Sequence, residues 1–258
     1  MSDQVLFELI DGVAEITLAN EQKHNAITGK MRDQLYELLA RVELDPQVKV
    51  VLLKGNGKSF CSGSNVGAMG ESTVINTREK MVLFNKIIQK IYMMEKPVIS
   101  AVQGYAVGAG CAIALASDFI IATRNASFGF PFTTIGLVPD CGSTYFLPRL
   151  VGLPKTKEWL FDAAKISAIE AEQRGMINRV VDNDSLLTEA RAFAEKVKNG
   201  PYQAFSMIKT IVNRSLHLEL DDVLELERFA QSIAQQTNDH KEGVAAFMEK
   251  RTPKFHGK

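Results

Sequence analysis

The sequence has few cysteines and none in a pattern typical of a metal site or a disulfide framework. Its 258 residues include three cysteines, Cys61, Cys111 and Cys141, which lie far apart and form no Cys-x-x-Cys pair. An odd number of scattered thiols favours reduced cysteines in the cytoplasm over a disulfide scaffold or a zinc site. The four histidines also lack the spacing of metal ligands, so we expect no metal.

The sequence also lacks an excess of charge of either sign. Its 30 Lys and Arg residues balance its 30 Asp and Glu residues. A nucleic-acid-binding protein normally shows a basic excess, so we expect no nucleic-acid partner. Low-complexity tracts and blocks of like charge are absent, which argues against disorder. The composition, 46% hydrophobic and 23% charged, is that of a globular enzyme or ligand binder.

No segment is predicted to be a secretory signal or to span a membrane. Residues 1–4 lack a basic region followed by an apolar run, so we expect a cytoplasmic protein. Residues 97–117 carry no charge and are long enough to cross a bilayer. They include Pro97, Gln103 and three glycines, and their first half has the pattern of a strand and their second that of a helix. We therefore expect a buried strand–turn–helix unit and no membrane partner.

Hydrophobic periodicity predicts an α/β fold with largely parallel strands. Residues 5–10 and 13–18 flank Asp11-Gly12, which is typical of a β-hairpin. Strand and helix patterns then alternate along the chain, as they do in folds with parallel strands. The expected helices are residues 28–43, 77–94 and 108–116, and the expected strands are residues 48–53, 98–102 and 119–122.

Beyond about residue 154 the strand patterns almost vanish, apart from residues 177–181. Helices are expected at residues 155–163, 168–174, 186–198, 202–215, 220–237 and 240–250. Gly200-Pro201 interrupts this series, so we divide the chain into a core of residues 1–200 and a helical region of residues 201–258. These last helices are too few to form a core alone, and we expect them to pack on the main domain or on a neighbouring subunit.

Three common motifs are incomplete or absent. Gly57-Lys58-Ser59 follows a strand as a P-loop would, but the required first glycine is replaced by Leu52. Gly108-Ala109-Gly110 opens a helix after a strand, but the third small residue of a dinucleotide-binding fingerprint is replaced by Ile113. No Gly-x-Ser-x-Gly elbow is present, so a hydrolase triad has little support.

Two loops rich in small residues are the best candidates for a catalytic site. Residues 59–65 and 103–111 each follow a predicted strand. Their backbone N–H groups could converge on one oxygen, and the second loop opens a helix whose dipole favours developing negative charge. On the pattern alone, ordinary tight turns are the more frequent explanation of such loops.

Several motifs resemble those of the crotonase, or enoyl-CoA hydratase/isomerase, superfamily. They occur in family order over essentially the whole chain: residues 23–27, residues 60–64, residues 104–110 followed by Ser117-Asp118, and residues 242–251. The resemblance implies a spiral of ββα turns and a C-terminal helical region that forms trimers, often paired as a dimer of trimers. It also implies an acyl-CoA thioester as substrate, with coenzyme A as part of that substrate and no permanently bound cofactor.

The same resemblance implies an oxyanion hole for the thioester oxygen. On this sequence, its two donors are the backbone N–H groups of Ser64 and Ala109, and one such donor contributes about 3–4 kcal/mol to transition-state stabilisation. The residues placed along the CoA and acyl groups are Lys23, His24, Ala26, Cys61, Ser62, Ser64, Asn65, Val66, Gly108 and Phe132. Phe247 and Lys250, from the same or a neighbouring subunit, are placed near the adenine and phosphates. A helix-end cation that complements the dipole is an equally good interpretation of Lys250.

Hydratases that this chain resembles have two catalytic glutamates, and this chain has neither of them. Ala112 and Phe132 occupy those positions, and neither side chain can transfer a proton, which argues against efficient hydration. Asp140 is the only charged residue within residues 125–148. Pro139-Asp140 followed by Gly142 is good turn chemistry, and Asp can cap a helix, so the pattern alone favours a structural role for Asp140.

The resemblance strengthens the catalytic interpretation of Asp140. Dienoyl-CoA isomerases and a dehalogenase branch of the superfamily have an aspartate at this place, and the stretch is most similar to 1,2-epoxyphenylacetyl-CoA isomerases, in which it is the base. We therefore expect an acyl-CoA isomerase that works through a thioester enolate, shifting a double bond from 3-enoyl to 2-enoyl or rearranging a ring epoxide. The alternatives are an enoyl-CoA hydratase with an altered acid/base set and a non-catalytic acyl-CoA binder.

Overall fold

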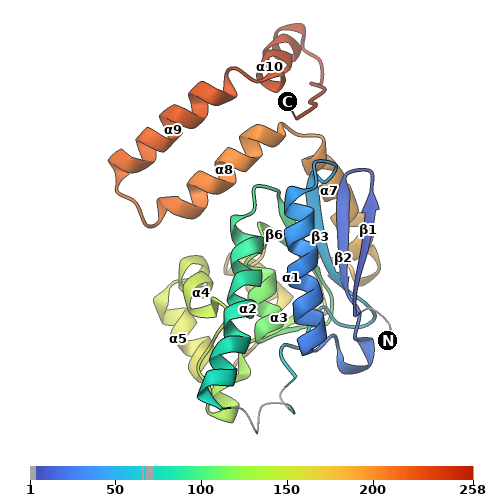
Figure 1. Ribbon diagram of the computed structural model, residues 1–258, viewed down its shortest axis with the longest axis vertical. Helices are drawn as coiled ribbons and strands as arrows, with labels where there is room; N and C mark the ends of the chain where they lie inside the picture. Colours follow the sequence, from blue (N-terminus) through green and yellow to red (C-terminus); the bar gives the residue numbers. More distant parts are fainter. Residues whose placement is uncertain (1–3, 66, 68–72, 258) are drawn as a thin grey trace.

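A six-stranded sheet forms the centre of the molecule (Figure 1). The computed structural model describes residues 4–65, 67 and 73–257. In spatial order the strands are β1 (Val5–Ile10), β2 (Val13–Leu18), β3 (Val50–Gly55), β4 (Val98–Val102), β6 (Phe119–Thr123) and β9 (Arg179–Val181). The β1–β2 hairpin turns at Asp11-Gly12 and is antiparallel, whereas every later pair in this sheet is parallel. The expected α/β fold with largely parallel strands is confirmed.

Helices cover both faces of this sheet. On one face, α1 (Gly29–Leu44), α2 (Val74–Met93) and α3 (Ala109–Leu115) share a core with the strands. On the other, α7 (Leu186–Lys198) packs against alternate residues of the same strands. Burial on both faces explains why the central strands are continuous apolar runs and do not alternate.

A second, small sheet was not predicted from the sequence. It consists of β5 (Tyr105–Val107), β7 (Ser127–Gly129) and β8 (Lys165–Ser167), in that order. Three residues are too few to show a periodicity, so these strands have no sequence signal of their own. The sheet matters for the site because Gly108 alone separates the end of β5 from the start of α3.

The segment at residues 97–117 is a buried strand–turn–helix unit, as expected. It contains β4, β5 and α3, and every residue of β4 and α3 is buried. Within the described residues, no helix is long and apolar enough to cross a membrane.

One helix of the body was missed and others begin earlier than expected. The missed helix is α4 (Ser143–Val151), which has no side-chain N-cap and contains Pro148, so its sequence lacks the usual start signal. Helix α2 begins at Val74, with Thr73 as its N-cap, and not at residue 77. Further helical segments in the described part of the body are η1 (Glu21–Lys23), η3 (Pro131–Ile135), α5 (Leu153–Phe161), α6 (Ala168–Gln173) and η4 (Asn183–Ser185).

Three helices form a tail that projects from one end of the body (Figure 1). They are α8 (Tyr202–Ser215), α9 (Leu220–Ala234) and α10 (Asn238–Glu249), so the helix expected at 220–237 ends at Ala234. Lys209 fastens α8 to the body: its Nζ donates to the backbone oxygens of Ile91 and Lys96 at 3.1 Å and to Asp118 Oδ2 at 2.7 Å. By contrast, none of the 15 residues of α9 is buried.

Candidate active site

The two loops rich in small residues lie side by side. The backbone N–H of Phe60 donates to the oxygen of Gln103 at 2.7 Å, and that of Cys61 donates to Tyr105 at 2.9 Å. In return, the N–H of Val107 donates to the oxygen of Cys61 at 2.9 Å. The first loop therefore pairs with β5 as a short strand would. This pairing fixes the positions of the two loops relative to each other.

Gly63 allows this approach. A Cβ built on Gly63 would lie 2.7 Å from the oxygen of Val107 and 3.6 Å from the nitrogen of Ala109, and its φ of +93° is strained for other residues. Ser64, the next residue, is thereby placed beside Ala109. Within the part of the chain that the structure describes, neither the Ser64 N–H nor the Ala109 N–H donates to another protein group. Two unused amide donors from different loops are what an oxyanion hole requires.

The segment of residues 23–26 runs along the first loop. Ser62 donates from its backbone N–H to the oxygen of His24 at 2.9 Å and from its Oγ to the oxygen of Lys23 at 3.1 Å. The thiol of Cys61 donates to the oxygen of Asn25 at 3.2 Å. The structure thus brings together most residues expected along the substrate: Lys23, His24, Ala26, Cys61, Ser62, Ser64 and Asn65. Val66 lies outside the described residues.

Asn25 links the segment of residues 23–26 to the loop after β3. It was not singled out from the sequence. Its buried side chain donates from Nδ2 to the backbone oxygens of Asn56 and Ser59, at 2.9 and 2.7 Å, and its Oδ1 accepts from the N–H of Asn20. The amide therefore links the segment before α1 to the loop after β3. Its place within the motif at residues 23–27 was the only available signal.

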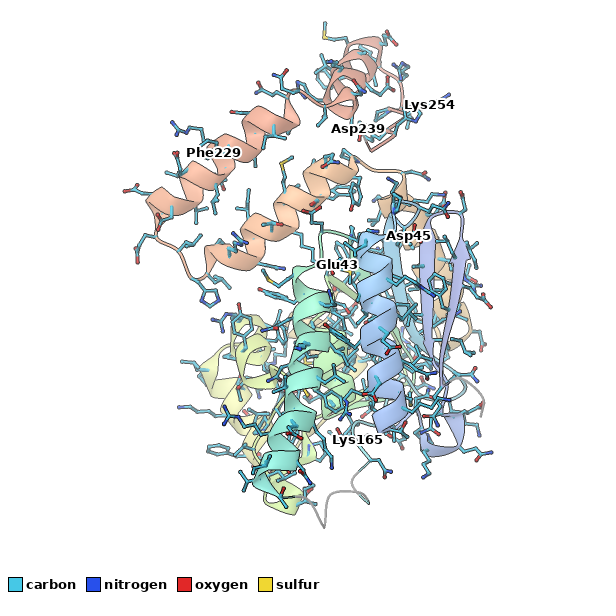
Figure 2. The ribbon with its side chains drawn as sticks, in the orientation of Figure 1. Glu43, Asp45, Lys165, Phe229, Asp239 and Lys254 are labelled. Atoms are coloured by element: carbon cyan, nitrogen blue, oxygen red, sulfur yellow. The ribbon has the colours of Figure 1, made fainter. Side chains whose placement is uncertain are left out.

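Tyr105 and Lys165 were also missed. The ring of His24 meets that of Tyr105 edge-on, with 5.6 Å between centroids, and Lys165 Nζ lies 5.9 Å from the centroid of Tyr105. Figure 2 shows Lys165 at the end of the body opposite the tail. A cation and two rings beside the first loop suit an anionic, aromatic group, but β8, which carries Lys165, had no recognisable sequence pattern.

Apolar groups occupy the positions of the two missing glutamates. The ring tip of Phe132, its Cζ, lies 3.8 Å from where a Cβ on Gly108 would be, so the ring sits against the residue before Ala109. Ala112 is fully buried one turn into α3, where its N–H donates to the oxygen of Gly108. Both positions flank the proposed hole without offering a proton-transfer group.

Asp140 precedes α4, but its carboxylate does not cap that helix. Its backbone oxygen accepts from the N–H and the Oγ of Ser143, at 3.0 and 2.8 Å, while the N-cap position belongs to Gly142. The turn is therefore built by the main chain, and the interpretation of this carboxylate as a cap is wrong.

The environment of Asp140 suits a proton acceptor. Its Oδ1 is buried and has no hydrogen-bond partner among the described residues. Burial raises the pKa of the carboxyl above its ordinary value.

Within one chain, Phe247 and Lys250 do not reach the loops of residues 59–65 and 103–111. Phe247 is 82% exposed on α10, and Lys250 is the C-cap of that helix, with a φ of 55°. Figure 1 places α10 at the far end of the tail. If these side chains contact a CoA group, they do so in another subunit, and within its own chain Lys250 occupies the helix-end position.

Comparisons with known proteins agree with this arrangement. A family model described as enoyl-CoA hydratase/isomerase matches residues 8–258. The 1,2-epoxyphenylacetyl-CoA isomerase of Escherichia coli (strain K12) is 35% identical over 263 residues and covers 100% of both chains. The short-chain-enoyl-CoA hydratase of Clostridium acetobutylicum is 35% identical over 250 residues, covering 96% of each. A crystal structure of an enoyl-CoA hydratase from Bacillus anthracis has a TM-score of 0.94 at 30% identity, covering 99% of this chain and 100% of that one.

These matches span essentially the full length of the chain, as the motifs do. The expected crotonase-like fold is confirmed by the structural similarity. The chain belongs to the enoyl-CoA hydratase/isomerase family.

Proposed function

We propose that this protein is an acyl-CoA isomerase that acts through a thioester enolate. The observation that carries the proposal is the carboxylate of Asp140, whose Oδ1 is buried and has no partner among the described residues. It is supported by the backbone N–H groups of Ser64 and Ala109, which donate to no other protein group in that part of the chain. In this scheme the Ser64 and Ala109 N–H groups bind the thioester oxygen. Gly108 and Phe132 lie against the acyl group, and residues 23–26 and 61–65 lie along the CoA portion of the substrate.

The reaction on a 3-enoyl thioester needs only one acid/base group. The Asp140 carboxylate removes a proton from C2, and the electrons of that C–H bond pass into the conjugated system to give a dienolate whose charge rests on the thioester oxygen. The protonated Asp140 then returns the proton to C4, leaving the double bond between C2 and C3. Backbone donors stabilise the negative oxygen between the two steps. Rearrangement of a ring epoxide is a second substrate option consistent with the isomerase relative.

Hydration is the main alternative within the family, and hydratases are among the relatives. Adding water needs one group to activate the water and a proton source for C2. Ala112 and Phe132 supply neither, and the Phe132 ring fills space beside Gly108. A hydratase would have to use Asp140 in an altered arrangement. A non-catalytic acyl-CoA binder is the alternative outside catalysis.

We further propose that the core of residues 1–200 carries the site and that residues 201–258 assemble the protein as a homotrimer or a dimer of trimers in the cytoplasm. The apolar side chains that α9 leaves exposed support a role in assembly. Phe247 and Lys250 would then approach the CoA adenine and phosphates of a neighbouring subunit.

The test is Asp140→Asn, assayed for 3-enoyl-CoA isomerisation beside crotonyl-CoA hydration. Removing the general base should lower isomerisation by about 10²- to 10⁴-fold while binding of the CoA ester is retained. Asp184→Asn, at an exposed aspartate of η4, is the matched control and should behave as wild type.

Three results would contradict the proposal in different ways. Unchanged isomerisation by Asp140→Asn removes Asp140 from the mechanism. Wild-type hydration that exceeds isomerisation identifies a hydratase. Tight binding of the CoA ester without solvent exchange of its α-proton identifies a binder.

A further inference from the structure

The segment of residues 23–27 has an unfavourable backbone conformation. His24 has a φ of +50° and Asn25 a φ of +56°, so two consecutive residues are left-handed. Asparagine tolerates this region better than most residues that have a side chain, but usually as a single residue. Such a turn persists only where the surrounding contacts hold it in place.

The fully buried side chain of Asn25 supplies such contacts. Its Nδ2 donates to the backbone oxygens of Asn56 and Ser59, at 2.9 and 2.7 Å, and its Oδ1 accepts from the N–H of Asn20 at 2.8 Å. The main chain of Asn25 is bound as well. Its N–H donates to the oxygen of Asn20 at 2.9 Å, and its oxygen accepts from the thiol of Cys61 at 3.2 Å. These bonds fix the turn against the loop of residues 59–65.

Two residues after Asn25, the same segment orients the peptide unit that carries a proposed oxyanion donor. The N–H of Ile27 donates to the oxygen of Gly63 at 2.8 Å, and the oxygen of Ile27 accepts from the N–H of Asn65 at 3.4 Å. No peptide bond among the described residues is cis, and in a trans unit the C=O and the N–H point in opposite directions. Because the oxygen of Gly63 faces Ile27, the N–H of Ser64 faces away from the segment.

The direction of the Ser64 N–H therefore depends on where residues 25–27 lie. This geometry explains why that N–H donates to no other protein group in the described part of the chain. An oxyanion hole is effective only if its donors are oriented before the reaction begins. A residue that fixes residues 25–27 would thus act on catalysis without touching the substrate.

We propose that Asn25 is a positioning residue for the oxyanion hole: its side-chain amide fixes residues 25–27 and, through Ile27, directs the Ser64 N–H at the thioester oxygen. This inference rests on the proposed function, because it takes Ser64 as a donor. Asn25 is fully buried, so it acts through the backbone of the two segments that it joins.

The experiment observes the thioester carbonyl directly, by infrared spectroscopy of bound butyryl-CoA with ¹³C at its carbonyl carbon. This saturated thioester can be neither isomerised nor hydrated. Hydrogen bonds from the hole polarise the C=O bond and lower its stretching frequency below that of free butyryl-CoA. Asn25→Gly removes the amide but still allows the left-handed backbone. It should lose about half of the wild-type shift, because one of two donors is misdirected.

The kinetics should change in the same variant. We expect Asn25→Gly to lower kcat for 3-enoyl-CoA isomerisation by about 10²-fold, as the loss of one oxyanion donor does. KM should change less than kcat, because the donor acts mainly on the charge that develops in the transition state.

Two further variants separate positioning from stability. Asn20→Ala removes only the bond from Asn20 Nδ2 to the oxygen of Ala26, at 2.8 Å, and should lose a smaller part of the shift. If Asn25→Gly does not fold, this milder variant decides alone. Asn178→Ala is the matched control: its Oδ1 accepts from the N–H of Ile120 at 2.7 Å, so its loss should lower Tm without changing the carbonyl frequency.

A carbonyl shift equal to that of the wild type in Asn25→Gly and Asn20→Ala, with Tm lowered, would overturn the proposal and leave Asn25 a purely structural residue. The infrared measurement depends neither on turnover nor on Asp140. Wild-type protein that binds butyryl-CoA without any carbonyl shift would refute the oxyanion hole, and with it the proposed function. A normal shift in the variants alone would refute only the positioning role.

Discussion

Gly108 has a backbone conformation that few other residues adopt, with φ 53° and ψ −122°. It is followed at once by Ala109, whose N–H is one of the two donors proposed for the thioester oxygen. Among the described residues, a Cβ on Gly108 would meet only the ring tip of Phe132, at 3.8 Å, so there is space for a methyl group. Any penalty for replacing this glycine must come from the backbone.

Replacing Gly108 by alanine should therefore act through the direction of the next amide. We expect Gly108→Ala to reduce stability by about 1–3 kcal/mol and to lower kcat for isomerisation by about 10²-fold, as the loss of an oxyanion donor does. Thermal unfolding and steady-state kinetics measure the two effects. Ala109→Gly is the control: the donor belongs to the backbone, so kcat should stay close to the wild-type value. A Gly108→Ala enzyme with normal kcat would separate this turn from the chemistry.

Among the elements, the packing of α7 on the sheet depends on an acidic residue in an apolar layer. Glu15 of β2 is 3% exposed, and its carboxylate accepts two hydrogen bonds from Arg191 of α7, at 2.6 and 2.9 Å. Lys54 of β3 pairs with the same carboxylate. The hydrogen bond from Arg191 is the largest of the effects that lower the pKa of Glu15, to about 2.

This ion cluster should make stability depend on acid pH. The pKa of Glu15 is lower in the folded state than in the unfolded chain, so its contribution is fully present above about pH 4.5 and is lost as pH falls toward 2. We expect Glu15→Gln to reduce the free energy of unfolding by about 2 kcal/mol at pH 7 and by clearly less at pH 3. Urea unfolding at the two pH values measures this.

The matched control is Glu37→Gln, which removes an exposed carboxylate from α1 and should change stability by less than about 0.5 kcal/mol. If the Glu15→Gln deficit were equal at pH 7 and pH 3, the effect would come from packing and not from charge.

Comparison of the helices and strands with the sequence shows which of them could be predicted from local patterns. The hairpin, the long helices of the tail and the central strands were predicted because their periodicity extends over five or more residues. The second sheet was not, because β5, β7 and β8 have three residues each and are stabilised by their neighbours. Helix α4 was hidden by its glycine cap and by Pro148.

At the scale of the whole molecule, the tail carries several exposed apolar side chains. Leu224, Phe229 and Ile233 of α9 are each more than half exposed, and Phe229 lies on the projecting helix in Figure 2. Isolated exposed apolar residues are common, but several along one amphipathic helix are typical of an interface. This surface is where the proposed subunits would meet.

An acidic residue in this surface should block assembly without unfolding the chain. We expect Phe229→Asp to lower the molar mass measured by size-exclusion chromatography with light scattering, because each symmetric interface would bury the new charge. Ala192→Asp, on the exposed face of α7, is the control and should keep the wild-type mass. If Phe229→Asp also keeps the wild-type mass, α9 is not part of the interface.

The sequence by itself determined the fold class, most helices and the identity of the candidate catalytic groups. These depend on information carried locally: hydrophobic periodicity, turn residues and the motifs that contain Ser64, Ala109 and Asp140. Such features can be read without knowing which distant segments meet.

Only the tertiary structure decided where these residues lie relative to one another and whether their polar groups are buried or hydrogen-bonded. The contact of Gly63 with Ala109, the ring of Phe132 against Gly108 and the open oxygen of Asp140 all arise where separate segments pack together. Burial raises the pKa of the Asp140 carboxyl above its ordinary value. Desolvation and hydrogen-bond geometry are properties of the assembled surroundings, so a linear pattern can name a candidate carboxylate but cannot show how far it is buried or what it bonds.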